Sequence, residues 1–108
     1  MNAQQLAKEC GFEIIHMAEE SPEVTGAYAC DLLSWVIGRA EAGAALVTVM
    51  TNVNVIAVAV MAELSCVILT EGVTIDKAAL QKAKMQEISV LRSNLPSYET
   101  CLKIGKVL

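Results

Sequence analysis

The sequence predicts one α/β domain spanning residues 1–108, with helices on both faces of a mostly parallel, mixed sheet of about five strands. Its hydrophobic content is 55% but its aromatic content only 4%, so the core is expected to consist of aliphatic side chains. Short apolar runs of strand length alternate with helical segments from residue 45 onward. Because the connections are short, this alternation implies parallel strands joined by right-handed crossovers, in a three-layer α/β/α arrangement.

Composition also limits the class of binding partner and the cellular location that we expect. The formal net charge is −4 and the pI is about 4.9, which argues against nucleic acid as a partner because phosphate binding needs a basic surface. Residues 1–11 contain no apolar stretch of signal-peptide length, so a cytoplasmic location is expected. The cysteines lie far apart in sequence and are expected to be packing residues rather than a redox pair or a zinc site: Cys10, Cys30, Cys66 and Cys101.

The first third of the chain predicts two helices and two strands. Asn2 is placed to cap the first helix, which stops at Gly11, and Asp31 is placed to cap a shorter helix that ends near Gly38. These two strands can pair antiparallel at one side of the sheet, which would make the sheet mixed. In order, the expected elements are helix 3–11, strand 12–17, a charged loop over 18–23, strand 24–30 and helix 32–39.

Residues 42–62 contain no charged side chain, so they could form a membrane span or the interior of a domain. Two asparagines, Asn52 and Asn54, sit near the middle of the run, and burying an unpartnered polar side chain costs about 1–3 kcal/mol. Neither a cluster of Lys and Arg nor a belt of aromatic residues flanks the run. A membrane is therefore not expected as a partner.

The same run is better explained as a strand, a turn and a helix. "ALVTVM" (45–50) has the length of a strand buried on both faces, and Thr51 and Asn52 then supply helix-capping side chains. We expect the helix over 53–64. Its β-branched residues make "VNVIAVAV" a poor helix former that could also be a strand, but a single strand from 45 to 60 would be too long for a small domain.

The rest of the chain continues the alternation of strands and helices. Asp76 is placed to cap the most clearly amphipathic segment, whose Ala79, Leu80 and Ala83 can face inward while its lysines stay in water. Pro96 and Ser97 suit the start of the final helix. In order, the expected elements are strand 66–70, helix 77–87, strand 88–93 and helix 98–108.

Residues of catalytic type are sparse. The single histidine, His16, lies in an expected strand, where packing is favoured over catalysis, and the pair Glu19–Glu20 lies in a solvated loop. Neither a GxxxxGK[ST] phosphate loop nor a GxGxxG loop occurs. We therefore assign no catalytic residue, no metal site and no cofactor, and expect that the chain is not an enzyme.

Polar residues follow the ends of neighbouring buried strands, where ligands bind in open parallel sheets. A helix that starts there offers free N–H groups to an anion. Arg92 ends another strand at the same edge and is the guanidinium group best placed to serve such a ligand. Capping and turn formation alone also explain these residues, and we favour that explanation over a ligand site. The candidate ligand-binding residues are Thr51, Asn52, Asn54, Thr70, Glu71, Gly72 and Arg92.

Two of these segments, "VTVMTNVNVIAVA" and "CVILTEGVTID", resemble a DRTGG domain, a small α/β module named for an Asp-Arg pair and a later Thr-Gly-Gly. Asn52-Val53 holds the place of the Asp-Arg pair, and Thr70-Glu71-Gly72 that of Thr-Gly-Gly. The resemblance covers essentially the whole chain, including "VTGAYACDLLSWVIGRA", which is similar to the opening of stand-alone members. The changes to Asn, Val and Glu keep the helix cap, remove the arginine and add a negative charge, so they weaken any anion site that the motif carries.

The resemblance implies a regulatory or oligomerising role rather than catalysis. DRTGG domains accompany CBS pairs in regulated pyrophosphatases and phosphotransacetylase regions, and their fold is similar to the N-terminal domain of HPr kinase/phosphorylase. Stand-alone members accompany hydrogenase-type redox proteins, which implies an accessory role in a redox or metabolic enzyme complex. A kinase label can be attached to such chains, but we reject kinase activity here because no phosphate-binding loop is present.

Two functions remain. The first is a non-catalytic interaction module that self-associates as a homodimer or binds a partner protein. Its basis is the apolar helix 53–64, which needs cover from the last helix or from a second subunit, with Trp35 as a core or interface anchor. The second is a sensor that binds a nucleotide or another anion at the carboxyl ends of the strands.

Overall fold

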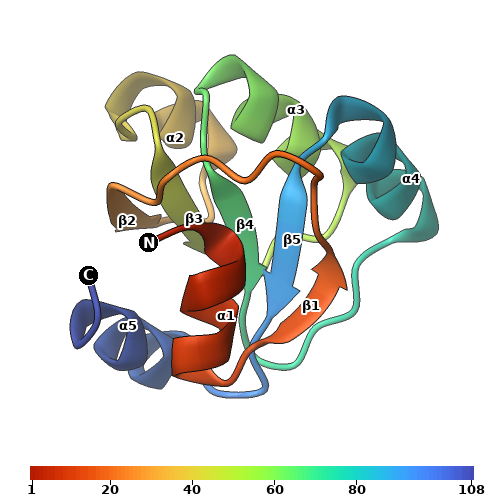
Figure 1. Ribbon diagram of the computed structural model, residues 1–108. Coiled ribbons are helices and arrows are strands. Elements are labelled where there is room, and N and C mark those ends of the chain that lie inside the picture. Colours follow the sequence, from red (N-terminus) through yellow and green to blue (C-terminus); the bar gives the residue numbers. More distant parts are fainter.

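The computed structural model describes all residues, 1–108, as one five-stranded sheet between two layers of helices (Figure 1). In chain order the elements are α1 (Ala3–Cys10), β1 (Glu13–His16), β2 (Gly26–Ala29), α2 (Leu33–Arg39), β3 (Ala44–Thr48), α3 (Val53–Met61), β4 (Cys66–Leu69), α4 (Lys77–Gln86), β5 (Ser89–Arg92) and α5 (Ser97–Gly105). Helices α1 and α5 cover one face of the sheet, and α2, α3 and α4 cover the other. The expected order of elements and the three-layer α/β fold are confirmed.

The sheet is mixed, but not in the way that its N-terminal strands suggest. The strand order is β1-β5-β4-β3-β2. Strands β2 to β5 are parallel, whereas β1 runs antiparallel to β5 with Glu13 opposite Arg92. An antiparallel strand at one side is therefore correct for β1 and wrong for β2. The segment after β1 crosses the end of the sheet and carries the chain to the opposite edge (Figure 1).

Strands β3 and β4 form the centre of the core and are buried on both faces. Ala44 and Leu46 of β3 pack on the side of α2, α3 and α4, whereas Ala45 and Val47 pack on the side of α1 and α5. This alternation follows from the two-residue period of a strand. Because helices pack against both faces of β3 and β4, the positions of these strands are fixed. The segments that follow their carboxyl ends therefore start from fixed positions.

Helix α3 begins where the sequence predicts and ends earlier, at Met61 rather than Leu64. The side-chain oxygen of Asn52 accepts a hydrogen bond of 2.9 Å from the backbone N–H of Asn54 and caps the helix. Glu63 adopts a left-handed backbone with φ 54°, and its carbonyl oxygen accepts a 2.9 Å hydrogen bond from the N–H of Gly43. This turn directs the chain into β4. No helix in the structure combines the length and the apolar character that crossing a membrane requires.

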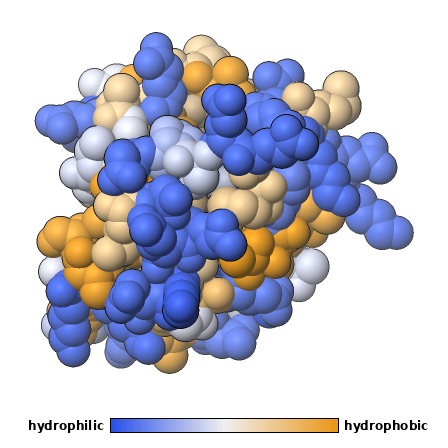
Figure 2. Space-filling model, in the orientation of Figure 1, coloured by the Kyte–Doolittle hydropathy of each residue, from blue (hydrophilic) through white to orange (hydrophobic).

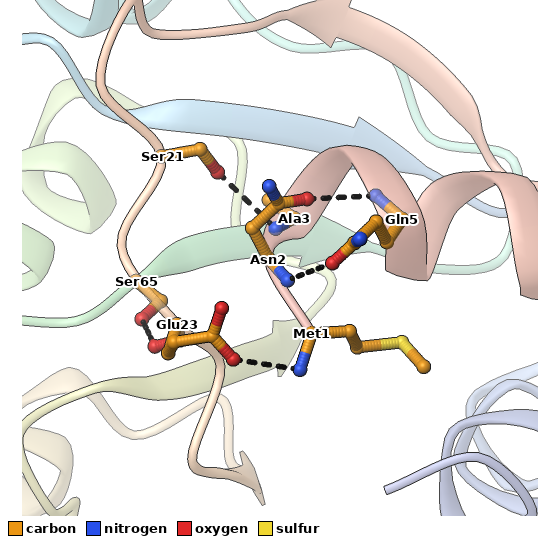
Figure 3. Close-up of polar contacts among 7 residues, drawn as sticks. All are labelled: Met1, Asn2, Ala3, Gln5, Ser21, Glu23 and Ser65. Atoms are coloured by element: carbon orange, nitrogen blue, oxygen red, sulfur yellow. Dashed lines mark hydrogen bonds and ion pairs between the residues drawn. The ribbon is translucent and has the colours of Figure 1, made fainter.

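The N-terminal segment is tied to the loop before β2 (Figure 3). Asn2 and Gln5 form a reciprocal capping box at the start of α1, as the position of Asn2 predicts, and Gly11 ends the helix in a left-handed conformation. The ammonium group of Met1 lies 2.8 Å from a carboxylate oxygen of Glu23, and the hydroxyl of Ser65 donates to the Glu23 carbonyl. These contacts link the first residues to the segment before β4.

Two expected caps are wrong. The first turn of α2 has Leu32 at its cap position and receives no side-chain hydrogen bond, because Asp31 turns toward the end of β3 instead. Its Oδ1 accepts hydrogen bonds from the hydroxyl of Thr48 at 2.8 Å and from the N–H of Val49 at 3.0 Å. Asp76 holds the cap position of α4 but makes no capping bond, since its carboxylate accepts from the hydroxyl of Thr51.

Candidate functional site at the carboxyl ends of the strands

The candidate residues lie where β3, β4 and β5 end and the chain leaves the sheet. The segment from Thr70 to Asp76 connects β4 to α4 and links the ends of the two neighbouring strands. On one side it bonds to Thr51, which follows β3, and on the other it bonds to residues that follow β5. The candidate side chains therefore form two groups rather than one cluster.

The first group follows β3, and its residues make hydrogen bonds to nearby parts of the chain. The hydroxyl of Thr51 lies 3.1 Å from Oδ1 of Asp76, and the carbonyl of Thr51 accepts a 3.1 Å hydrogen bond from the Asp76 N–H. Asn52 caps α3 through its side chain, and Asn54 contributes its backbone N–H to that cap. The free donors that a helix start could offer to an anion are thus partly used by Asn52.

The second group follows β4 and surrounds the start of α5. The hydroxyls of Thr70 and Ser97 lie 2.7 Å apart, and Oε2 of Glu71 accepts a 2.8 Å hydrogen bond from the Ser97 N–H. Glu71 and Gly72 both adopt left-handed backbones, with φ of 60° and 67°. The Glu71 carboxylate therefore lies at the N-terminus of α5, where free N–H groups and the helix dipole favour negative charge.

Arg92 belongs to this second group and anchors the loop after β4. Its Nε donates a 2.9 Å hydrogen bond to the carbonyl of Val73, and its Nη2 donates to the carbonyl of Gly72. Its Nη1 lies 3.8 Å from Oε1 of Glu13. Only about a quarter of the Arg92 side chain is exposed, with 24% relative accessibility. One side of the guanidinium is therefore used for structure, and Nη1 has no hydrogen-bond partner in the chain.

Sequence reasoning missed the partners of these residues. Asp31 binds the end of β3, Ser97 meets both Thr70 and Glu71, and the hydroxyls of Ser93 and Thr100 pair at 2.8 Å in the interior. The only local signal was the presence of buried polar residues directly after apolar strands, since such residues need hydrogen-bond partners. That signal does not reveal which distant residue supplies the partner.

The cysteines behave as packing residues in this structure. All four are free thiols, and Cys10, Cys66 and Cys101 lie between the sheet and the layer of α1 and α5. Burial raises the pKa of Cys66 to about 12. Burial also raises the pKa of Cys10 and of Cys101 above the usual value of 9.0. Raised pKa values suppress the thiolate form that nucleophilic and metal-binding chemistry needs. No three His, Cys, Asp or Glu side chains gather in a metal-binding arrangement.

The comparison with known families identifies the fold. The pattern of the DRTGG domain matches residues 5–107. This chain belongs to the DRTGG domain family. The two segments that resemble the family's motif, Asn52-Val53 after β3 and Thr70-Glu71-Gly72 after β4, lie in the two groups described above. No curated protein matches this DRTGG domain in sequence.

A solved structure shows the same fold. The crystal structure of the CBS and DRTGG domains of the regulatory region of Clostridium perfringens pyrophosphatase, complexed with the activator diadenosine tetraphosphate, matches with a TM-score of 0.76 at 16% identity. The match covers 95% of this chain and 45% of the other. The present DRTGG domain thus spans less than half of that regulatory region, and the likeness at this identity shows the fold.

Proposed function

We propose that this DRTGG domain is a non-catalytic regulatory module that self-associates as a homodimer. The observation that supports the proposal best is the apolar outer surface of α3 and its neighbour α2. No residue of α3 is charged, and Val53, Val60 and Met61 are exposed on it, Met61 by 65%. A helix that is apolar on its outer side as well as its inner side favours cover by another protein surface.

Helix α2 extends this surface. It packs beside α3 and exposes Trp35 by 48% and Ile37 by 44%, with the Arg39 guanidinium stacked 3.7 Å above the Trp35 ring. Tryptophan and arginine are the residue types that most often anchor protein interfaces. In contrast, the face of the molecule that carries α1 is mostly hydrophilic (Figure 2). We name the exposed side chains of Trp35, Ile37, Val53, Val60 and Met61 the α2–α3 face.

A second copy suits the α2–α3 face better than a charged partner. Apolar surface with few charges can pair with itself around a two-fold axis without burying an unpaired charge. The last helix does not provide the cover, because α5 lies on the other side of the sheet. Self-association would bury the exposed parts of α3, which contributes about 25 cal/mol for each Å² of apolar surface removed from water.

Replacing Met61 with lysine tests the homodimer. A lysine at this exposed position should leave the fold intact and convert the dimer to a monomer, since pairing would bury two unpartnered charges. Light scattering after size exclusion would report the mass. Leu102→Lys is a matched control, because Leu102 is 47% exposed on α5 in the opposite layer. Equal masses for the wild type and Met61→Lys would contradict the assigned surface.

The second candidate function is small-molecule sensing at the carboxyl ends of the strands. It is supported by Nη1 of Arg92, which makes no hydrogen bond and lies beside a surface pocket, and by the nucleotide activator bound to the regulatory region of the pyrophosphatase. A ligand at 100 times its dissociation constant should add about 2.7 kcal/mol to the free energy of unfolding. Thermal unfolding with a panel of nucleotides measures this, and no shift at millimolar concentration would contradict nucleotide sensing.

The cellular setting is a third part of the proposal. We place the domain in the cytoplasm, as an accessory of a redox or metabolic enzyme complex, with the family resemblance as support. Four free cysteines are consistent with a reducing compartment. Affinity capture of the wild type and of Met61→Lys, each from the native host, would test for a partner enzyme. Recovery of no enzyme with the wild type would contradict the accessory role.

A further inference from the structure

A polar pocket opens where α1, β5 and α5 meet, beyond the carboxyl end of β5. Its volume is about 330 Å³, and its lining includes Gly11, Glu13, Arg92, Asn94 and Lys103. Figure 1 shows the elements that carry these residues, with the end of α1 approaching α5 at the lower end of the sheet. The pocket shares Arg92 with the group after β4, but its other lining residues belong to none of the family's motif positions.

The pocket gathers positive charge in a domain that is acidic overall. Arg92 comes from β5 and Lys103 from α5, and the ammonium group of Lys103 lies 3.5 Å from the carbonyl oxygen of Cys10 at the end of α1. The one carboxylate in the lining is Glu13. It stays 3.8 Å from Nη1 of Arg92, which is too long for a hydrogen bond, and its side chain is 58% exposed. Glu13 can therefore swing into solvent when a stronger anion enters.

The guanidinium of Arg92 is held in place before any ligand arrives. Nε and Nη2 are fixed by the carbonyls of Val73 and Gly72, so the pocket loses little side-chain entropy when Nη1 meets an anion. The side-on pair of donors that a planar carboxylate prefers is already used. A tetrahedral phosphoryl group suits the remaining arrangement better, because its oxygens point in different directions and do not need two coplanar donors.

We infer that this pocket binds the phosphoryl group of a small organic phosphate between Arg92 and Lys103. A volume of about 330 Å³ lies at the lower end of the range for small-molecule sites, which favours a compact phosphate ester. Phe12 and Leu95 in the lining offer apolar contact for the organic part. Glu13 competes with the ligand for Arg92. The inference rests on the sensing function proposed above and names its site and ligand class.

The test is a titration of the full chain, labelled with ¹⁵N, with glycerol phosphate at constant ionic strength, followed by amide chemical shifts. Saturating shifts are expected for Gly11, Phe12, Asn94 and Leu95. Lys103→Gln should weaken binding at least about tenfold, because it removes a charge-assisted hydrogen bond. Glu13→Gln should tighten binding, because it removes the competing carboxylate. Lys106→Gln, which removes the same charge outside the pocket, should leave binding within about twofold of the wild type.

Several results would overturn the inference. If glycerol phosphate produces no saturating shift, or if lactate binds as tightly, a phosphoryl site is wrong. If Lys103→Gln binds like the wild type, or if Lys106→Gln weakens binding equally, the anion does not occupy this pocket. A parallel titration with AMP separates the two proposals. If AMP produces saturating shifts only at amides outside this pocket, the sensing function is supported and the pocket is wrong. If neither glycerol phosphate nor AMP produces a saturating shift, both the sensing function and the pocket are wrong.

Discussion

Glu71 carries its carboxylate to the first turn of α5, where Oε2 accepts a 2.8 Å hydrogen bond from the N–H of Ser97. An acidic group at this end of a helix both satisfies a free donor and meets the positive end of the helix dipole. Glu71 makes this contact from a left-handed backbone with φ 60°, a conformation that is unfavourable for residues other than glycine. Glu71 thus supplies the negative charge at the start of α5 from within the chain.

Two substitutions of Glu71 separate these effects. Glu71→Ala should lower the free energy of unfolding by about 1 kcal/mol, because it removes the cap and keeps the strained backbone. Glu71→Gly removes the same cap but relieves about 1 kcal/mol of left-handed strain, so it should stay near the wild type. Urea unfolding measures both. Glu99→Ala is the control, since Glu99 lies in the same turn without a hydrogen bond, and an equal loss there would refute the capping role.

Because of the Cys66 thiol, the free energy of unfolding should depend on pH in the alkaline range. Because burial raises its pKa to about 12 in the folded state, the unfolded chain releases this proton first, from about 9.0 upward. The contribution of Cys66 to the free energy of unfolding should therefore be constant below pH 9.0 and fall by about 1.4 kcal/mol per pH unit between the two values. Cys10 and Cys101, whose pKa values are also raised, add to the fall.

Urea unfolding across the alkaline range tests this prediction. Cys66→Ala should be less stable at neutral pH because it leaves a cavity, but its stability should fall less steeply above pH 9.0. Val67→Ala, which leaves a cavity at the next position of β4, should keep the wild-type slope. Identical slopes for all three proteins would show that the Cys66 thiol does not control the alkaline behaviour.

At the scale of elements, α3 forms from residues with weak helix propensity. Its β-branched residues Val55, Ile56 and Val58 are buried, so packing against β3 and β4 supplies the stability that propensity does not. Its start is encoded locally by Asn52, which is why the sequence predicted it correctly. Its end depends on Glu63, whose carbonyl binds Gly43 before β3, and a contact between such distant residues leaves no local pattern.

The cap of α3 can be tested with three substitutions. Asn52→Ala should cost about 1 kcal/mol of stability, because the N–H of Asn54 loses its partner. Asn52→Asp should match or exceed the wild type, since it keeps the acceptor and adds a favourable charge. Asn54→Ala should have little effect because its side chain makes no hydrogen bond. Thermal unfolding measures all three, and a stable Asn52→Ala would show that the cap is dispensable.

For the whole molecule, the sequence predicted the layers and the order of elements but not the arrangement of the edges. The alternation of apolar strands and helices after residue 45 is a local pattern, and it led directly to the parallel sheet. The positions of β1 and β2 depend on the segment that joins them across the end of the sheet. Glu23 in this segment contacts Met1 and Ser65, and the sequence contains no local pattern that predicts contacts between such distant residues.

The candidate site shows the same limit. Its residues were predicted to share one edge of the sheet, and Thr70, Glu71, Gly72 and Arg92 do lie together after β4 and β5. Thr51 and Asn52 form a separate group with Asp76. Strand polarity fixes the edge, but side-chain partners decide the grouping. The lysine of the proposed phosphate pocket comes from α5, a helix whose position over the sheet the sequence does not reveal.

Our central proposal is that this DRTGG domain pairs with itself through the α2–α3 face. Light scattering of the wild type after size exclusion, over a series of dilutions into the micromolar range and with and without a mixture of ATP, ADP and AMP, tests it most directly. We expect a mass of twice 11.5 kDa that does not depend on nucleotide. A mass of 11.5 kDa at every concentration would contradict self-association.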